Sequence, residues 1–524
     1  MTEQPPPIDP DRTPHLPPAA DPWSAQPTVI EFGAPLPSDG ERPRRRRTTV
    51  FLSIAVVVAL LLGGAAFAGV RLWNGSGAQP EEAVPASVAA FTRLDLSAGL
   101  GQGLKLNALL RKFPKGTGGE EAIDQLKAGL FGAVDIDEAD YHAHVEPWFA
   151  DRFGLAVWRD KADRPYLLAA IASSDDRRAA NGLKTLQDKR GANKFGFAVD
   201  DRWALVAVGD TSSQDAATSA AAQANAAPLA AADEFRDAVA TLPGRQPLLA
   251  WADLGRVAAV FVDAMRSGMA GNDAQMPDVE AMRGRIVLGG QATDNGIEVR
   301  VRASGLSGPA PAAKATNVLG RLGELPANSA VASAIRLPDF GDNGLPGISQ
   351  FLRGPQLADL PPEVAAELAK DPDFVKAQAE FKAVTDAVRA LSGASITLAL
   401  TDVTSPGLRA VGDLAGTDLA ASLTAALRDV GDEVTVKRDG ARVELRTRGY
   451  APQGKLSESA TYRETMDDMP GDAMAAVYVD IQRLADQGGA TEQERREIAP
   501  IKSVGLVSGH DGADMVAMLR VLIK

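Results

Sequence analysis

The sequence predicts an α+β protein with a single N-terminal transmembrane helix followed by an internally duplicated domain of antiparallel sheets with helices packed on them. Three observations carry this prediction: a long apolar run without charges, two stretches that repeat at a constant separation, and apolar runs joined by tight turns. The chain has 524 residues, of which 45% are hydrophobic. This length and composition suffice for two or more domains with buried cores.

The composition also excludes several classes of protein. The chain contains no cysteine, which excludes disulfides, thiolate metal sites and a cysteine nucleophile. Its four histidines are too few to favour a histidine-dependent hydrolase or a zinc enzyme. A net charge of −13 argues against nucleic acid as a partner, because nucleic-acid-binding surfaces are basic.

The first segments form a tail and an anchor. Residues 1–47 are rich in proline and lack apolar periodicity, so we expect a disordered cytoplasmic tail. Residues 48–72 follow, and no charge occurs between Thr48 and Val70. At about 1.5 Å per residue this run spans a hydrocarbon core of about 30 Å. The sequence therefore predicts a transmembrane helix and contact with the lipid bilayer.

The charges beside this segment predict its orientation. Five arginines precede it and only Arg71 follows closely, so the positive-inside rule places the N-terminus in the cytoplasm and the C-terminal domain outside. We expect a single-pass protein of the plasma membrane. A cleaved signal peptide is the alternative, because Ala66-Phe67-Ala68 resembles a cleavage site, but the apolar run and the region before it are both too long. Residues 73–84 are expected to form a short linker.

An internal repeat organises the remainder of the chain. FRDAVATLPGRQPLLAWADL and YRETMDDMPGDAMAAVYVDI both run aromatic, arginine, acid, Pro-Gly and an apolar stretch that ends in aspartate. The matching residues, always 227 positions apart, are Phe235 and Tyr462, Arg236 and Arg463, Pro243 and Pro470, and Asp253 and Asp480. Matching apolar hairpins lie upstream in both halves. Such register-matched pairs indicate duplication.

The duplication predicts two similar lobes, 85–305 and 319–524, joined by a linker at 306–318. Apolar runs joined by tight turns predict antiparallel sheet with helices on one face. Proline is expected to end a helix and the following glycine to allow a tight turn into a strand. Asp253 and Asp480 are expected to cap the next helix. The sequence leaves open whether the lobes share one sheet.

A glycine-rich turn offers a first candidate site. Gly99, Gly101 and Gly103 are followed by Lys105, and these are the ingredients of a phosphate-binding loop. However, Leu106 stands where such a loop needs serine or threonine for magnesium. Two of the three matching passages elsewhere in the chain also lack these glycines. We therefore predict a structural turn and no cofactor.

The stretch DIDEADYHAHVEP offers a second candidate. Placed on a strand, His142 and His144 would share one face, with Asp140 and Glu146 nearby, which is a set of metal ligands. The run lacks the glycine of a calcium loop, and its counterpart DAVRALSGAS contains no such ligands. A solvated polar loop is the favoured interpretation, and these four residues remain the metal candidates.

Other motifs point to structure. Trp148 follows Pro147 before an apolar strand, which favours a side chain that fills the core, with ligand stacking as the alternative. The sequence contains neither the Gly-x-Ser-x-Gly pattern of a serine hydrolase nor the His-Glu-x-x-His pattern of a zinc protease. We therefore predict no catalytic residues.

Several of these stretches resemble a known family. The opening VPASVAAFTRLDL, the step LRKFPKG and the strand EPWFADRFGLAVW are similar to actinobacterial membrane-anchored proteins grouped as the domain of unknown function 3352 family. The resemblance covers most of residues 80–524. One departure is Ala150, which stands where a small turn residue, usually glycine, is expected. It implies a membrane setting and a fold, and it assigns no functional residues.

These features together predict binding or scaffolding at the bacterial cell envelope, with an envelope protein, a peptide or a lipid as partner. The alternative is a cell-envelope hydrolase that uses paired carboxylates, which can be distant in the chain. Titratable groups with shifted pKa values that converge in one pocket would favour the hydrolase. A broad apolar groove would favour a peptide or lipid ligand.

Overall fold

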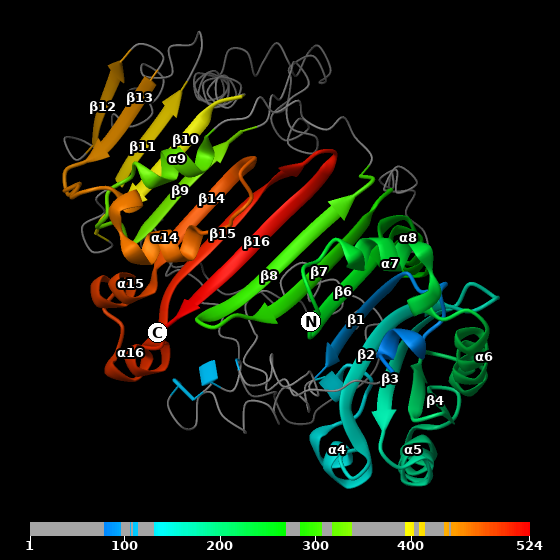
Figure 1. The fold of residues 1–524 in the computed structure, drawn as a ribbon. Helices are drawn as coiled ribbons and strands as arrows, with labels where there is room; N and C mark the ends of the chain where they lie inside the picture. Colours follow the sequence, from blue (N-terminus) through cyan, green and yellow to red (C-terminus); the bar gives the residue numbers. More distant parts are fainter. Residues whose placement is uncertain are drawn as a thin grey trace, which may run out of the picture. The chain divides into compact units, whose positions relative to one another are not determined.

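The computed structural model describes much of the chain after the predicted membrane segment (Figure 1). The described residues are 78–95, 105, 108–109, 111–113, 130–268, 283–306, 317–337, 393–402, 408–413, 434–439 and 442–524. The predicted tail 1–47 and the predicted transmembrane helix 48–72 lie outside them. Within the described ranges, no helix is long and apolar enough to cross a membrane.

Each half of the domain contributes eight strands to one antiparallel sheet, with helices between them. The first half comprises η2 (Pro80–Glu82), β1 (Ala90–Asp95), α4 (Glu138–His144), β2 (Phe149–Arg159), β3 (Pro165–Ser173), α5 (Asp176–Arg190), β4 (Phe195–Asp200), β5 (Trp203–Val208), α6 (Ser213–Ala226), η3 (Leu229–Ala231), α7 (Asp233–Ala240), β6 (Leu248–Asp253), α8 (Leu254–Gly268), β7 (Arg285–Ala292) and β8 (Gly296–Ser304). The second comprises α9 (Val318–Gly323), β9 (Val331–Arg336), β10 (Ser395–Leu400), β11 (Leu408–Asp413), β12 (Val434–Asp439), β13 (Arg442–Thr447), η7 (Leu456–Glu458), α14 (Ala460–Met466), β14 (Ala473–Asp480), α15 (Ile481–Gln487), α16 (Glu492–Ile498), β15 (Ile501–Asp511) and β16 (Asp514–Ile523).

The strand order confirms the α+β class and shows that the halves match. From one edge the order is β4, β5, β3, β2, β1, β6, β7, β8, and from the other edge it is β12, β13, β11, β10, β9, β14, β15, β16. Each strand of the first half therefore has a counterpart eight strands later. The two halves share one sixteen-stranded sheet, which answers the question that the sequence left open.

The halves meet where β8 pairs with β16, a junction that we call the seam. The pairing is antiparallel and places Arg300 opposite Met518 and Arg302 opposite Val516. In the closing hairpin of the first half, Arg285 pairs with Ser304. In the closing hairpin of the second half, Ser503 pairs with Leu522, so each residue of the first hairpin matches the residue 218 positions later. By this rule Arg300 matches Met518. An approximate two-fold axis therefore passes through that pair, perpendicular to the sheet.

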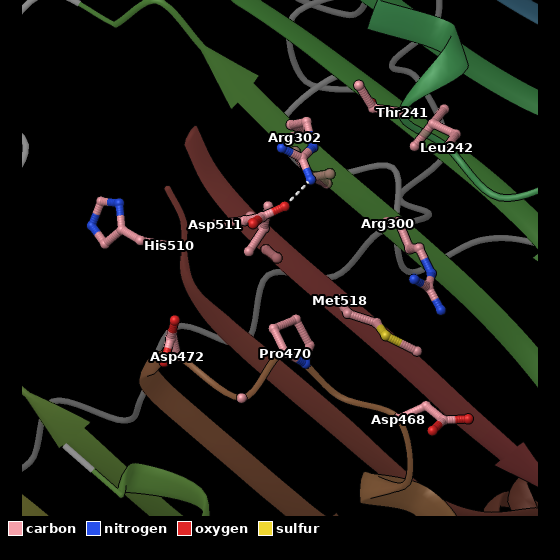
Figure 2. A pocket seen from close by; sticks show the side chains of 14 residues that line it. Thr241, Leu242, Arg300, Arg302, Asp468, Pro470, Asp472, His510, Asp511 and Met518 are labelled. Atoms are coloured by element: carbon pink, nitrogen blue, oxygen red, sulfur yellow. Dashed lines mark hydrogen bonds and ion pairs between the residues drawn. The ribbon is translucent and has the colours of Figure 1, made fainter. Parts of the chain in front are cut away.

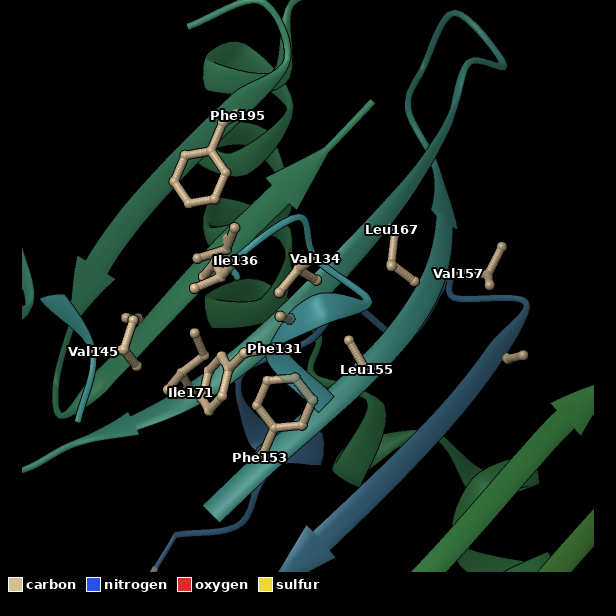
Figure 3. Packing of buried hydrophobic residues seen from close by; sticks show 14 of the residues in the cluster. Phe131, Val134, Ile136, Val145, Phe153, Leu155, Val157, Leu167, Ile171 and Phe195 are labelled. Atoms are coloured by element: carbon tan, nitrogen blue, oxygen red, sulfur yellow. The ribbon is translucent and has the colours of Figure 1, made fainter. Parts of the chain in front are cut away.

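Helices cover both faces of the first half, which corrects the prediction of helices on one face. On one face, Leu183 of α5 belongs to the same buried cluster as Leu155. Figure 3 shows Leu155 in this cluster together with Phe153 and Val157 of β2. Side chains of α6, such as Ala217, pack with Ala156 and Leu168 on the other. The signal was present in YLLAAIAS of β3, since an unbroken apolar run predicts a strand that is buried on both faces.

The matching elements of the two halves pack in the same way. The rings of Phe235 and Trp251 meet edge-on with centroids 5.9 Å apart, and those of Tyr462 and Tyr478 do so at 5.3 Å. Each partner of the second pair lies 227 positions after its counterpart, which confirms the predicted repeat. The arginine that follows each aromatic residue is exposed, so its recurrence has no packing role.

The Pro-Gly turns follow the prediction in one half only. After α7, the glycine next to Pro243 adopts a φ of +64°, the left-handed conformation expected there. After α14, the residue with positive φ is Asp468, at +53°, two positions before Pro470. The second turn therefore places its left-handed residue earlier than predicted.

The expected capping role of both aspartates is confirmed. The backbone N–H of Arg256 donates to Asp253 Oδ1 at 3.0 Å, and that of Arg483 donates to Asp480 Oδ1 at 3.0 Å. Each arginine side chain also lies within 3.8 Å of the same carboxylate. The carboxylates thus satisfy N–H groups at the starts of α8 and α15.

Replacing either aspartate by alanine is expected to lower the free energy of unfolding by about 1 kcal/mol, because one N–H group at the helix start loses its acceptor. Since Asp253 and Asp480 make the same contacts, Asp253→Ala and Asp480→Ala should have similar effects. Urea unfolding of both variants measures this. Asparagine at either position should retain most of the stability, and an equal loss with asparagine would contradict the capping role.

The predicted linker 73–84 needs a correction. Pro80–Glu82 forms a short 3-10 helix, and both Glu81 and Val84 are buried. Arg152 Nη1 donates to the carbonyl of Ala78 at 3.0 Å. Residues 78–84 therefore belong to the folded domain, since buried side chains hold them against the sheet.

Candidate functional site

A cavity of about 300 Å³, the seam pocket, lies over the two-fold axis of the sheet (Figure 2). Strands β8 and β16 form its floor, and the loops after α7 and α14 contribute to its walls. Thr241 and Leu242 come from the first loop, and their counterparts in the repeat are Asp468 and Met469. The duplication thus builds this pocket, because it brings matching loops together across the seam.

The charged groups beside the floor are joined in pairs. Arg302 Nη1 donates to Asp514 Oδ2 at 2.6 Å, and its other terminal nitrogen donates to Asp511. Arg300 Nε donates to Glu298 Oε1 at 2.6 Å. The hydrogen bond to Asp511 and the further carboxylate raise the pKa of Arg302 above its usual range, against the effect of burial.

Glu298 is held in its ionised form. Burial by itself would raise the pKa of this carboxyl, but hydrogen bonds from Arg300 and Arg520 outweigh burial and lower it. Arg520 Nη2 lies 3.1 Å from Glu298 Oε2, so this carboxylate ties β8 to β16. The contact joins the two halves of the repeat.

The remaining polar groups of the seam pocket do not converge. Figure 2 shows Asp468 and Asp472 on either side of Pro470, with their carboxylates pointing apart. The ring of His510 points away from both arginines. Its two nitrogens are buried and have no hydrogen-bond partner among the described residues. The pocket therefore presents separate polar groups around an apolar centre that includes Met518.

A second cavity of about 180 Å³, the α7 pocket, adjoins the first and shares Thr241 and Arg302 with it. Glu234, Asp237 and Ala238 of α7 line one side, and Arg285 lies on β7. Arg285 approaches Glu234 at 3.8 Å. The two cavities extend along β8 beneath the end of α7.

Three of the four metal candidates, Asp140, His142 and His144, lie on helix α4, and Glu146 follows its end, which corrects the predicted strand or loop. Residues two positions apart in a helix are separated by about 200° around its axis, so His142 and His144 do not share a face. Asp140 accepts hydrogen bonds from Lys189 at 2.7 Å and Arg190 at 2.8 Å. His142 Nδ1 lies 2.8 Å from Glu146. No cluster of three metal-ligating side chains occurs in the described part of the chain.

The sequence contained a signal for this helix. Asp137 accepts a hydrogen bond from the N–H of Asp140 at 2.8 Å, so it caps α4. Acidic residues in the first turn and histidines in the last complement the helix dipole. The hydrogen bonds from Lys189 and Arg190 lower the pKa of Asp140, although burial opposes them. These ion pairs fasten α4 to α5.

Trp148 fills the core, as predicted, and is 1% exposed. Its Nε1 donates to the carbonyl of His144 at 2.6 Å. Because the ring is buried, it offers no stacking surface to a ligand. The glycine turn at 99–103 lies outside the described residues. Lys105 Nζ is 2.8 Å from Asp294, whose side chain is exposed.

A buried ionic cluster beneath η2 was not predicted. Arg93 donates to Glu81 and, at 3.1 Å, to the carbonyl of Gln246. Asp95 is buried beside Arg152 and Arg245, at 3.6 and 3.4 Å. Burial raises the pKa of Glu81 despite Arg93, and burial lowers that of Arg93. The cluster was missed because Glu81 was assigned to the linker.

The fold defines an α+β domain of two matching halves that share one sheet and enclose polar pockets at their junction. No family model, curated protein or solved structure matches the chain. The resemblance to the domain of unknown function 3352 family therefore remains a prediction from residues 80–524.

Proposed function

We propose that this chain is a single-pass plasma-membrane protein with a cytoplasmic N-terminus, whose extracytoplasmic domain binds or scaffolds a partner at the bacterial cell envelope. The seam pocket is the observation that supports a binding role most directly. It is a concave site at the junction of two repeats, and such junctions commonly hold ligands. Its polar groups are spread around an apolar centre, which suits recognition of a partner.

The pKa shifts of Arg302 in the seam pocket and of Glu298 beside it suit a binding role better than acid–base catalysis. A general acid or base works best when its pKa is shifted towards neutrality. At the seam the shifts go the other way, because the pKa of Arg302 is raised and that of Glu298 is lowered. These groups suit fixed ionic contacts. A hydrolase with paired carboxylates stays the alternative.

Filling the pocket tests the binding role. Thr241 is exposed and lines both cavities, so Thr241→Trp in the full chain should abolish cross-linking to the envelope partner without changing the unfolding midpoint. Thr218→Trp, at an exposed position of α6, is the control and should leave the cross-link intact. Unchanged cross-linking by Thr241→Trp would contradict the proposed site. Loss of a hydrolytic activity in Asp468→Asn would favour the alternative.

The orientation has its own test. A reporter enzyme that is active only outside the cytoplasm, fused after Lys524, is expected to be active in cells that express the full chain. The physical reason is the excess of arginines before residues 48–72, which disfavours export of the N-terminus. The matched control fuses the same reporter before Met1, where it should be inactive. Activity at the N-terminus instead would overturn the proposed orientation.

A further inference from the structure

Matching arginines of the two halves are used differently. By the spacing of 218 at the seam, Arg302 on β8 matches Arg520 on β16. Arg520 Nη1 donates to main-chain carbonyls at the end of α14, at 3.3 Å from both Glu464 and Thr465. It also reaches the carbonyl of Asp467. Its guanidinium group therefore covers the negative end of this helix dipole.

In the first half, no arginine among the described residues donates to the main-chain carbonyls at the end of α7. Arg302 turns instead to Asp511 and Asp514 in the hairpin between β15 and β16. The α7 pocket lies at the matching position and is lined by Asp237 and Ala238, the counterparts of Glu464 and Thr465. The repeat thus contains one copy, the filled copy, in which a guanidinium group contacts the end of the helix and one copy, the open copy, in which, among the described residues, a guanidinium group does not.

The charges of the open copy also favour a cation. In the filled copy, Glu464 is contacted by Asn295 at 2.6 Å and by Lys502 at 3.4 Å. Asp237 occupies the matching place on α7 and is exposed at the pocket. The two cations that line this pocket each face a carboxylate: Arg285 faces Glu234 and Arg302 faces Asp514. The Ala238 carbonyl at the end of α7 accepts from the N–H of Thr241 at 3.2 Å and from its hydroxyl at 2.7 Å. The exposed Asp237 carboxylate therefore provides most of the attraction for a positive group.

We propose that the α7 pocket binds the guanidinium group of an arginine side chain from a partner polypeptide, held by Asp237 and the C-terminal end of α7. This proposal rests on the binding role above and specifies the chemistry of the partner. A guanidinium group fits better than an ammonium group, because its planar fork can reach several acceptors at once, as Arg520 does. A polypeptide fits the neighbouring seam pocket, which can receive residues flanking the arginine.

A pair of peptides tests the proposal on the full chain in detergent. One is acetyl-Gly-Ala-Arg-Ala-Gly-amide, and the other carries citrulline, which keeps the shape of arginine without its charge. The arginine peptide should bind about tenfold more tightly by isothermal titration, as expected for one charge-assisted contact. Asp237→Asn should remove this preference. Glu464→Gln, the matched control at the filled copy, should keep it.

A second variant tests whether arginine binding at α7 resembles the contact of Arg520 with the end of α14. In Asp511→Asn with Asp514→Asn, Arg302 loses both carboxylate partners and can turn to α7 as Arg520 does to α14. The arginine peptide should then bind at least about tenfold more weakly, because the protein fills its own site. Equal affinities for the two peptides on the wild-type chain would overturn the arginine site. If partner cross-linking persisted in that case, the broader binding role would stand. Arginine amide that binds as tightly as the peptide would overturn a polypeptide source.

Discussion

Replacing Arg93 by methionine is expected to lower the free energy of unfolding by about 3–5 kcal/mol at pH 7, because it leaves the buried Glu81 carboxylate without its partner. Arg93 and Glu81 are each 7% exposed. Methionine keeps much of the volume of the arginine stem, so the loss of stability measures the effect of the missing charge more than that of lost packing. Urea unfolding at pH 7 measures the effect.

The destabilisation by Arg93→Met is expected to depend on pH, because the Glu81 carboxyl can be protonated. Burial places the pKa of Glu81 above its usual value of 4.5. The raised pKa therefore adds to the free energy of unfolding at low pH. This contribution is fully present below pH 4.5 and is lost as the pH rises through the pKa of Glu81 in the folded protein. Without Arg93 this pKa should rise further, so the destabilisation by Arg93→Met should shrink as the pH is lowered towards 4.5.

The control removes both charges. Glu81→Gln combined with Arg93→Met should be close to the wild type in stability, since an isolated buried charge is more costly than none. If the double variant is as unstable as Arg93→Met, burial of the Glu81 charge is not the cause. A destabilisation that stays constant between pH 7 and pH 5 would contradict the role assigned to Glu81.

The repeat could be predicted from the sequence because its most regular residues act locally. Asp253 and Asp480 cap the helices that follow them, and Phe235 and Tyr462 contact aromatic residues sixteen positions later. Such contacts depend on short spacings along the chain. A constant separation between two such sets is therefore visible without any knowledge of the sheet.

The seam could not be predicted in this way. Whether β8 pairs with β16 depends on two edges about 218 residues apart, and neither strand carries a local signal for its partner. Both pockets depend on this pairing, since Arg302 and Met518 approach one another only across it. The different use of Arg302 and Arg520 is invisible in sequence for the same reason: it depends on which carboxylates lie across the seam.

Two local predictions failed for reasons that can be identified. The alternation in His142 and His144 suggested a strand, but the cap at Asp137 and the burial of Tyr141 favour a helix there. Glu81 was assigned to a linker because the residues around it are polar. Its burial depends on Arg93, which is close in sequence but reaches it only once β1 joins the sheet.

Replacing Gly296 by alanine is expected to lower the free energy of unfolding by about 3 kcal/mol and to loosen the seam selectively. A Cβ atom at this position would overlap the main-chain carbonyl oxygen of Val521 on β16. Because the obstacle is backbone, the strands must separate, and the pairing of Gly296 with Leu522 should be lost first.

Hydrogen exchange of the full chain can distinguish this loosening from general unfolding. In Gly296→Ala the amides of β8 and β16 should exchange faster, while those of β3 and β5 keep their protection, because the first half retains its own core on both faces. Gly132→Ala is the matched control, since a Cβ there meets nothing within 4 Å and the residue lines neither pocket. Both pockets depend on the seam, so arginine-peptide binding should weaken in Gly296→Ala only. Equal exchange in the two variants would show that this contact does not hold the halves together.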